Sequence, residues 1–252
     1  MEVKDALIQY CLRLGDDAMI MGHRLSELCS NGPILEEDIA MTNISLDLFG
    51  QTRIIYTYAA ELEGKGRSED DLAYLRPEHE FQCALLTEQP NGHFGNTMAR
   101  QMIFSVFYYH LFKELSKSPD ESLAAFAAKS LKETTYHMRH ACEWVVRLGD
   151  GTEESKWKIQ DALNDIWSYH HELFEKDEVD EKLIDMGIIT DTATIADDFY
   201  ASVNEVIERA TLGTPAGGWK ATGGRSGRHS EYLGHILSVF QSLPRAYPDA
   251  KW

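Results

Sequence analysis

The chain has 252 residues, of which 43% are hydrophobic and 26% charged, an ordinary balance for a globular protein with a sizeable core. Its formal net charge of −17 disfavours nucleic acid or an anionic membrane as a partner, because both require clustered lysine and arginine. The four cysteines, Cys11, Cys29, Cys83 and Cys142, are scattered without a metal-binding or disulfide spacing, which favours a reducing cytoplasm.

The first helix is predicted over about residues 2–29, with an apolar face and Asp17 at the edge of that face. Its beginning carries Glu2, Lys4 and Asp5, so we expect no signal peptide. No run of about 18 apolar residues occurs anywhere, so we expect no transmembrane helix. Together with the cysteine pattern, these features predict a cytoplasmic protein.

A second helix is predicted over about residues 33–63, because a proline suits its first turn and helical periodicity continues to the end. Apolar side chains occur on nearly all of its sides, and we therefore expect it to be central to a bundle. Asn43, Asp47, Gly50 and Ile54 recur at i, i+4, i+7 and i+11 and share one stripe of this helix.

The third and fourth helices are predicted over about residues 94–115 and 121–148. The fourth begins after a Ser-Pro-Asp-Glu start signal at 118–121 and stops at Gly149. Before the third helix lies a long connection, about residues 64–91, with one or two short helices. A bundle with simple up-and-down connections does not need such a link, whereas ferritin-like folds contain a long crossover.

The C-terminal part continues the helical pattern. Further helices are predicted over about residues 153–174, 180–186, 195–212 and 230–241. The glycine-rich segment 213–228 follows no strand and contains no Gly-Lys-Ser or Gly-Lys-Thr, so we predict a mobile surface loop rather than a phosphate-binding loop. His170 and His171 are adjacent and point in different directions, and we expect both at the surface.

Taken together, the elements predict an all-α chain. We expect a ferritin-like four-helix bundle with a long crossover and additional C-terminal helices. The chain should form a single domain over residues 1–252, with the core bundle at about 2–148 and the C-terminal helices at about 152–241.

Two short motifs bear on metal chemistry. Ferritin-like di-iron proteins carry Glu-x-x-His on each of two helices, which places a carboxylate and an imidazole on the same side. Here Asp47 is followed three residues later by Gly50, and Glu133 by Tyr136, so both histidines are absent. We predict that these positions are vestigial, that the chain holds no metal, and that it contains no catalytic residue. We expect Asp47 to be paired with an arginine or tyrosine of a neighbouring helix.

The fourth helix leaves an alternative open. Glu133, His137 and His140 recur at i, i+4 and i+7, and with Asp47 they could form an unusual metal site. The chain would then be a ferritin-like metal-binding oxidase in its own right. Lysines and arginines crowd the same helix, however, and favour hydrogen-bonded or partner-facing pairs over a set of metal ligands.

Several stretches of the chain together resemble one family, the C subunits of the bacterial ring 1,2-phenylacetyl-CoA epoxidase. They are residues 12–16, 22–27, 43–51, 88–92, 136–137, 144–151, 227–229 and 245–248. The Glu-Gln-Pro-Asn-Gly turn at 88–92 and the Trp-x-x-Arg-Leu-Gly-Asp-Gly-Thr stretch from Trp144 are the most specific of these.

The resemblance implies a ferritin-like subunit of an NADPH-dependent monooxygenase complex in phenylacetate catabolism. In that family the A subunit holds the di-iron centre and binds the CoA thioester, and a reductase supplies the electrons. This chain would be a non-catalytic structural subunit without a cofactor of its own, pairing with and stabilising the A subunit within the complex. The remaining vestigial positions would be Asp16 or Asp17 on the first helix and Gln101 or Ser105 on the third.

Overall fold

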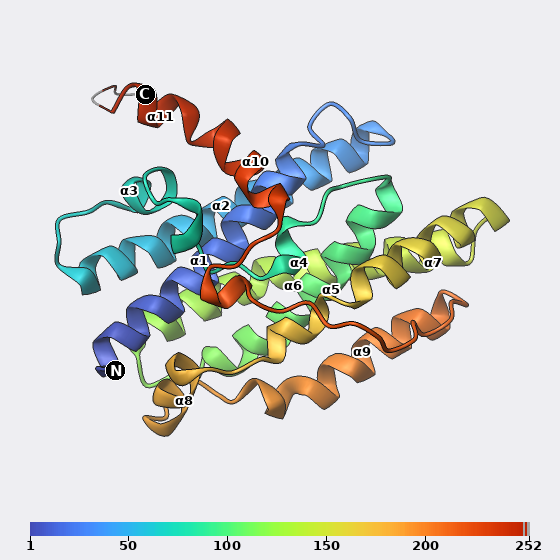
Figure 1. Ribbon diagram of the computed structural model, residues 1–252. Coiled ribbons are helices and arrows are strands. Elements are labelled where there is room, and N and C mark those ends of the chain that lie inside the picture. Colours follow the sequence, from blue (N-terminus) through green and yellow to red (C-terminus); the bar gives the residue numbers. More distant parts are fainter. Residues whose placement is uncertain (249, 251–252) are drawn as a thin grey trace.

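The computed structural model describes residues 1–248 and 250. Within them the chain is helical and contains no β-strand, as the sequence predicts (Figure 1). No helix in this described part is long and apolar enough to cross a lipid bilayer. The four long helices are α1 (Val3–Ser26), α2 (Leu35–Glu63), α5 (Phe94–Leu115) and α6 (Glu121–Gly149).

Shorter helices lie in the crossover and in the C-terminal part. The α-helices are α3 (Glu69–Tyr74), α4 (Leu85–Glu88), α7 (Glu153–Trp167), α8 (Glu178–Asp185), α9 (Ala196–Arg209), α10 (Glu231–Phe240) and α11 (Ser242–Ala246). The 3-10 turns are η1 (Glu78–Glu80), η2 (His170–Phe174), η3 (Thr192–Ile195) and η4 (Gly224–Ser226). Helices α7 and α9 pack on α5 and α6, and α8 packs on α1.

Helices α1 and α2 form an antiparallel pair. The Ser45 hydroxyl donates to the Gly22 carbonyl at 2.8 Å, and the Thr52 hydroxyl to the Gly15 carbonyl at 3.4 Å. Later residues of α2 therefore meet earlier residues of α1. A Cβ at Gly15 would collide with the Tyr56 ring, so glycine allows the two helices to approach closely there.

Aromatic contacts show that α5 and α6 are also antiparallel. The ring centroids of Phe112 and Phe126 lie 5.5 Å apart near the connecting turn, and those of Phe94 and Trp144 lie 5.1 Å apart at the far end. Both pairs meet edge to face, the arrangement that the charge distribution of aromatic rings favours. The bundle thus consists of two antiparallel helix pairs.

The relation between the two pairs identifies the crossover. The Gln51 amide donates to Glu133 at 2.9 Å, and the Tyr58 hydroxyl to Asp120 at 2.7 Å, so α2 and α6 run antiparallel. In an up-and-down bundle the second and fourth helices are parallel. The connection over residues 64–93 therefore returns the chain to the end where α2 began, which is the connectivity of a ferritin-like bundle.

The predicted helix boundaries hold where a capping residue defines them. Ser68, Asp120 and Thr152 each accept a hydrogen bond from the backbone N–H three residues later. The predicted fifth helix is shorter than expected, because α7 ends at Trp167 and a 3-10 turn follows. The predicted last helix is α10, and α11 after it accommodates Pro244 in its first turn.

Two expectations about exposure were wrong. Helix α2 is not buried all round, because Leu35, Ile39 and Leu46 lie on its outer side with 53–70% of their surfaces exposed. His170 is fully buried, since the η2 turn directs its ring toward α9, where Nε2 lies 3.0 Å from the Tyr200 hydroxyl. Burial lowers the pKa of His170 to about 4.

Candidate functional site

Two adjacent carboxylates near the middle of α1 are completely buried. Asp16 accepts hydrogen bonds from the Arg76 guanidinium, the Tyr56 hydroxyl and, at 2.7 Å, the Gln82 backbone N–H. Burying a lone carboxylate is very unfavourable, whereas a bidentate arginine and further donors compensate for the lost hydration. Asp16 is therefore a structural anion held by the crossover.

Asp17 is neutralised by a cation from a different segment. Its oxygens accept from the Ala84 backbone N–H at 2.6 Å, from the Tyr108 hydroxyl, and from the Arg225 guanidinium at 2.7 Å. Arg225 comes from the end of the glycine-rich segment, which crosses the bundle between α9 and α10 (Figure 1). The two α1 carboxylates thus join the bundle to the crossover and to the C-terminal part.

The glycine-rich segment 213–228 is not wholly a surface loop, and here the sequence prediction was wrong. Gly224 is buried, and its N–H donates to one oxygen of Glu172 at 2.6 Å. The Leu85 N–H donates to the other oxygen at 2.7 Å. A Cβ at Gly224 would collide with the Cys83 carbonyl, so glycine is required by this close approach rather than by mobility.

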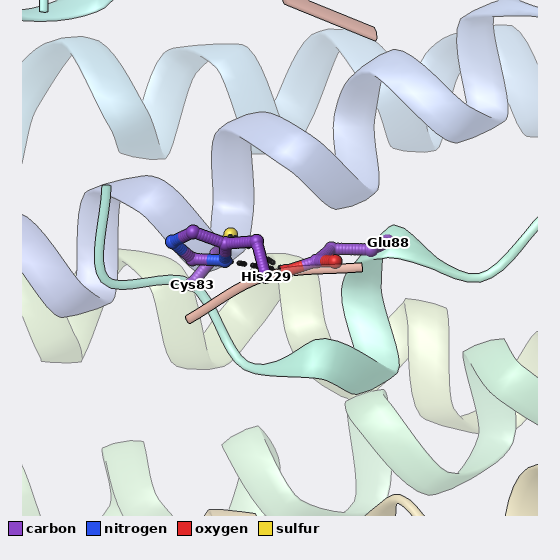
Figure 2. Close-up of side chains that lie close together, drawn as sticks. All are labelled: Cys83, Glu88 and His229. Carbon is purple, nitrogen blue, oxygen red and sulfur yellow. Dashed lines mark hydrogen bonds and ion pairs between the residues drawn. The ribbon is translucent and has the colours of Figure 1, made fainter. Parts of the chain in front are cut away.

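A third buried pair, Glu88 and His229, holds the chain directly after this segment, as Figure 2 shows. His229 Nδ1 lies 2.6 Å from Glu88, and its Nε2 lies 2.8 Å from the Phe81 carbonyl oxygen. The other Glu88 oxygen accepts from the Ser230 N–H and hydroxyl at 2.8 and 2.5 Å. Burial opposes the charge on His229, but the Glu88 carboxylate raises its pKa above the usual value. Because the Phe81 carbonyl oxygen can only accept, Nε2 carries a proton and donates to it.

Cys83, Glu88 and His229 form the single group of three or more potential metal donors found in the described part of the chain. The Cys83 sulfur lies 3.7 Å from Glu88 and 3.8 Å from His229. Burial and the nearby carboxylates raise the pKa of this thiol well above its usual range, and Glu88 and His229 neutralise each other. We interpret this group, with Asp16, Asp17 and their arginines, as one ionic junction that holds three chain segments together.

The four positions predicted to be vestigial lie away from this junction, along the contact between α2 and α6 and partly exposed. The side chain of Asp47 is 40% exposed, and Tyr136 is 50% exposed. A Cβ at Gly50 would meet no atom within 4 Å, and Glu133 is half-buried. Asp47 and Glu133 contact the buried side chains of His137 and Gln51. The descent of the four positions from metal ligands stays a prediction.

The polar residues between α2 and α6 form separate pairs. They are Asp47–His137 at 3.0 Å, Gln51–Glu133 at 2.9 Å and Glu37–His140 at 2.8 Å. Asp47 is paired across helices, as expected, although with a histidine instead of an arginine or tyrosine. Because Glu133, His137 and His140 each contact a different residue of α2, they do not converge on a common point where a metal could bind.

The bundle interior does not fit a di-iron centre. Apart from tyrosines, its buried polar side chains on α2, α5 and α6 are Glu37, Ser45, Gln51, Thr52, Thr97, Arg100, Gln101, Ser105, His110, Ser130, Thr134 and His137. A ferritin-like di-iron site needs carboxylates from all four helices, whereas the one carboxylate in this set, Glu37, already pairs with His140. The α1 carboxylates already bind Arg76 and Arg225. No redox step can therefore be derived for this chain's own residues.

Comparison with known proteins identifies the family of this chain. The family described as phenylacetic acid catabolic protein matches residues 1–252. The chain belongs to this family. A relative within it is the C subunit of 1,2-phenylacetyl-CoA epoxidase from Escherichia coli (strain K12), which is 44% identical over 246 residues, covering 98% of this chain and 99% of the relative. The family resemblance predicted from short motifs is confirmed.

Sequence reasoning did not find the ionic junction. Glu88 and His229 both lie in stretches that carry the family resemblance, yet nothing in the sequence links two residues 141 positions apart. Arg76 and Arg225 stand in segments that look like ordinary loops. The Asp16-Asp17 pair on an apolar helix could have indicated the junction, since buried carboxylates need cationic partners.

Proposed function

We propose that this chain is the non-catalytic C subunit of a phenylacetyl-CoA epoxidase, a multicomponent monooxygenase of aerobic phenylacetate degradation. It would pair with the di-iron A subunit and stabilise it in the cytoplasm, together with further subunits including the reductase. The observation that supports the non-catalytic role is the state of the α1 carboxylates. Both are neutralised by arginines of the same chain, so they are not free to hold a metal.

The role of the ionic junction follows from the same observation. In a di-iron bundle the metals link carboxylates from several helices, whereas here Arg76 and Arg225 link α1 to the crossover and to the C-terminal segment. The chain can therefore keep a rigid ferritin-like fold without a cofactor. The redox chemistry and the binding of the CoA thioester are assigned to the A subunit.

The test uses the chain alone and in the assembly. The purified chain, before and after iron reconstitution, should contain almost no iron by elemental analysis and show no oxo-bridged absorption band. With the A subunit, reductase and NADPH, it should raise both the rate of phenylacetyl-CoA epoxidation and the melting temperature of the A subunit. About two irons in each chain would establish the alternative, a metal-binding oxidase. Epoxidation at the full rate by the A subunit and reductase without this chain would contradict the proposed structural role.

A further inference from the structure

Arg100, on the second turn of α5, is a buried arginine without a carboxylate partner. Only 1% of its surface is exposed, and no carboxylate of the described residues lies within ion-pair distance of it. The other arginines that bury their guanidinium groups each have such a partner. The pairs are Arg13–Asp177, Arg24–Glu27, Arg76–Asp16 and Arg225–Asp17. Because a buried charge without a counter-ion is costly, Arg100 needs a separate explanation.

The hydrogen bonds of Arg100 do not neutralise its charge. Its Nη1 donates to the Gln89 carbonyl, and its Nη2 donates to the Asn91 side-chain oxygen at 2.6 Å. Both acceptors are neutral and belong to the Glu-Gln-Pro-Asn-Gly turn at 88–92. The Nε–H group of Arg100 has no acceptor among the described residues. The guanidinium therefore holds the turn in place and still has a free donor and a full positive charge.

This charge persists at neutral pH. Burial, and after it the neighbouring Arg24, lower the pKa of Arg100 to about 9, while Glu27 acts in the opposite direction. Glu27 already pairs with Arg24 at 3.0 Å, so it is not a free counter-ion for Arg100. Since a pKa of about 9 still lies above neutral pH, the guanidinium remains protonated.

A cavity adjoins Arg100 between the 88–92 turn, α5 and α7. Its volume is about 300 Å³, at the lower limit of the roughly 300–1,000 Å³ that is common for small-molecule sites. Apolar and aromatic side chains form part of the lining, namely Pro90, Ala162, Ile166 and Tyr169. The polar lining residues are Gln89, Asn96, Arg100 and Asp165. A mostly apolar wall with a few polar groups is the usual composition of a ligand site.

The charges around this cavity favour a ligand with a single negative charge. Arg100 provides the cation, and a hydrogen bond between ionised groups is stronger than one between neutral groups. Asp165 on α7 is exposed and lines the same cavity, so it opposes a second negative charge on the ligand. A phosphate monoester carries about −1.5 to −2 at neutral pH and is therefore less suitable than a carboxylate. The apolar wall favours a ligand whose remaining part is apolar.

From these observations we infer that the cavity beside Arg100 binds a small monocarboxylate with an aromatic or aliphatic body. The carboxylate of this ligand is the counter-ion that Arg100 lacks within the chain. Pro90, Ala162, Ile166 and Tyr169 surround the apolar part of the ligand. The site uses no residue of the ionic junction and none of the polar pairs between α2 and α6. It is independent of the proposed function and adds a small-molecule ligand to it.

Benzoate is a suitable probe, because it combines one carboxylate with a flat apolar body. Titration calorimetry of the full chain with benzoate should show saturable binding, and benzoate should raise the melting temperature as its concentration increases. Benzamide has nearly the same shape without the charge, and inorganic phosphate has more charge without the apolar body. Each should bind on the order of 10-fold more weakly or less, because a hydrogen bond between ionised groups and the apolar contacts are then lost separately.

Two variants should change the affinity for benzoate in opposite directions. Arg100→Gln removes the cation and should raise the Kd on the order of 10-fold or more. Asp165→Asn removes an exposed charge that opposes the ligand and should lower the Kd roughly 2- to 5-fold without affecting the fold. Asp161→Asn, also exposed and one turn earlier on α7, does not line the cavity and should bind like the wild type. The Asp165→Asn variant remains informative if Arg100→Gln does not fold.

Several results would overturn the inference. The wild-type chain might show no saturable binding of benzoate, or benzamide might bind as tightly as benzoate, and either result means that Arg100 needs no carboxylate ligand. Tighter binding of phosphate would contradict the assignment to a monocarboxylate. Equal effects of Asp161→Asn and Asp165→Asn would show that the net charge of the chain, rather than the cavity, determines the affinity. None of these measurements involves the A subunit, so the proposed function would stand in each case.

Discussion

Asp16 and Asp47 are carboxylates on two neighbouring helices, yet they differ in burial and in the number of hydrogen-bond donors around them. Asp16 is fully buried and receives donors from α2 and from two places in the crossover. Asp47 is 40% exposed and contacts one imidazole, that of His137. The first carboxylate is satisfied entirely by this chain, whereas the second lies beside apolar groups that nothing in the described part of the chain covers. This contrast separates groups that fix the fold from groups that are available to a partner.

The ionic junction and the outer side of α2 also differ in the distance along the chain that they connect. The junction unites α1 with the crossover and with residues 224–230, so it depends on the complete tertiary structure. The exposed residues on the outer side of α2, Leu35, Ile39 and Leu46, belong to one helix. Substitutions in the junction should therefore reduce the stability of the isolated chain, while substitutions of the exposed residues on the outer side of α2 should change it little.

The largest effect is expected from Arg76→Ala. This substitution leaves Asp16 buried without its cation, and breaking such a pair by removing one partner costs roughly 3–5 kcal/mol. The measurement is the free energy of unfolding by denaturant titration. Arg53→Ala is the matched control, since the Arg53 side chain is 78% exposed in its pair with Glu69 and should contribute no more than about 1 kcal/mol. Equal effects of the two substitutions would contradict the distinction between buried and exposed charges.

The second prediction concerns stability in acid. The buried His170 has a pKa of about 4 in the folded chain, below the usual value of 6.5, so the unfolded chain binds more protons between these two values. The free energy of unfolding should therefore fall as the pH falls through this window, by at most about 1.4 kcal/mol per pH unit from this residue. Denaturation curves between pH 7 and 4 measure this slope, and His170→Gln should reduce it. An unchanged slope in the variant would show that other groups cause the acid sensitivity.

The contribution of His229 to stability should depend on pH in the opposite direction to that of His170. Its folded-state pKa is raised because the Glu88 carboxylate stabilises the imidazolium against the cost of burial. The pair therefore contributes its full stability below about pH 6.5, and this contribution is lost as the pH rises through the folded-state pKa. His229→Gln should destabilise the chain more at pH 6 than at pH 9 in denaturant titrations. A larger loss at pH 9 would show that the ring is neutral in the folded chain.

The smallest effect on stability is expected from Asp47→Ala. Because this carboxylate is 40% exposed, removing it should lower the free energy of unfolding by about 1 kcal/mol or less, far less than Arg76→Ala. Thermal and denaturant unfolding of the isolated chain measure the change. A loss of several kcal/mol would place Asp47 with the ionic junction, and would remove the distinction between the two regions.

The sequence by itself determined the helices and much of their order, because capping residues such as Ser68, Asp120 and Thr152 act over three or four neighbouring positions. The long connection before α5 indicated the crossover. The interpretation of Asp47 and Glu133 as remnants of a di-iron site stays a prediction. These are local properties of the chain.

Only the tertiary structure decided which side of α2 faces inward. Ile44 and Leu48 line its buried side, but Leu35, Ile39 and Leu46 make the first half of the outer side apolar as well, so periodicity does not distinguish the two sides there. The ionic junction could not be predicted from the sequence either, since a buried carboxylate needs a cation but its position does not identify which one. Which cation pairs with each carboxylate depends on where the crossover and the C-terminal segment meet α1. Contacts between such distant segments, unlike helix capping, cannot be predicted from neighbouring residues.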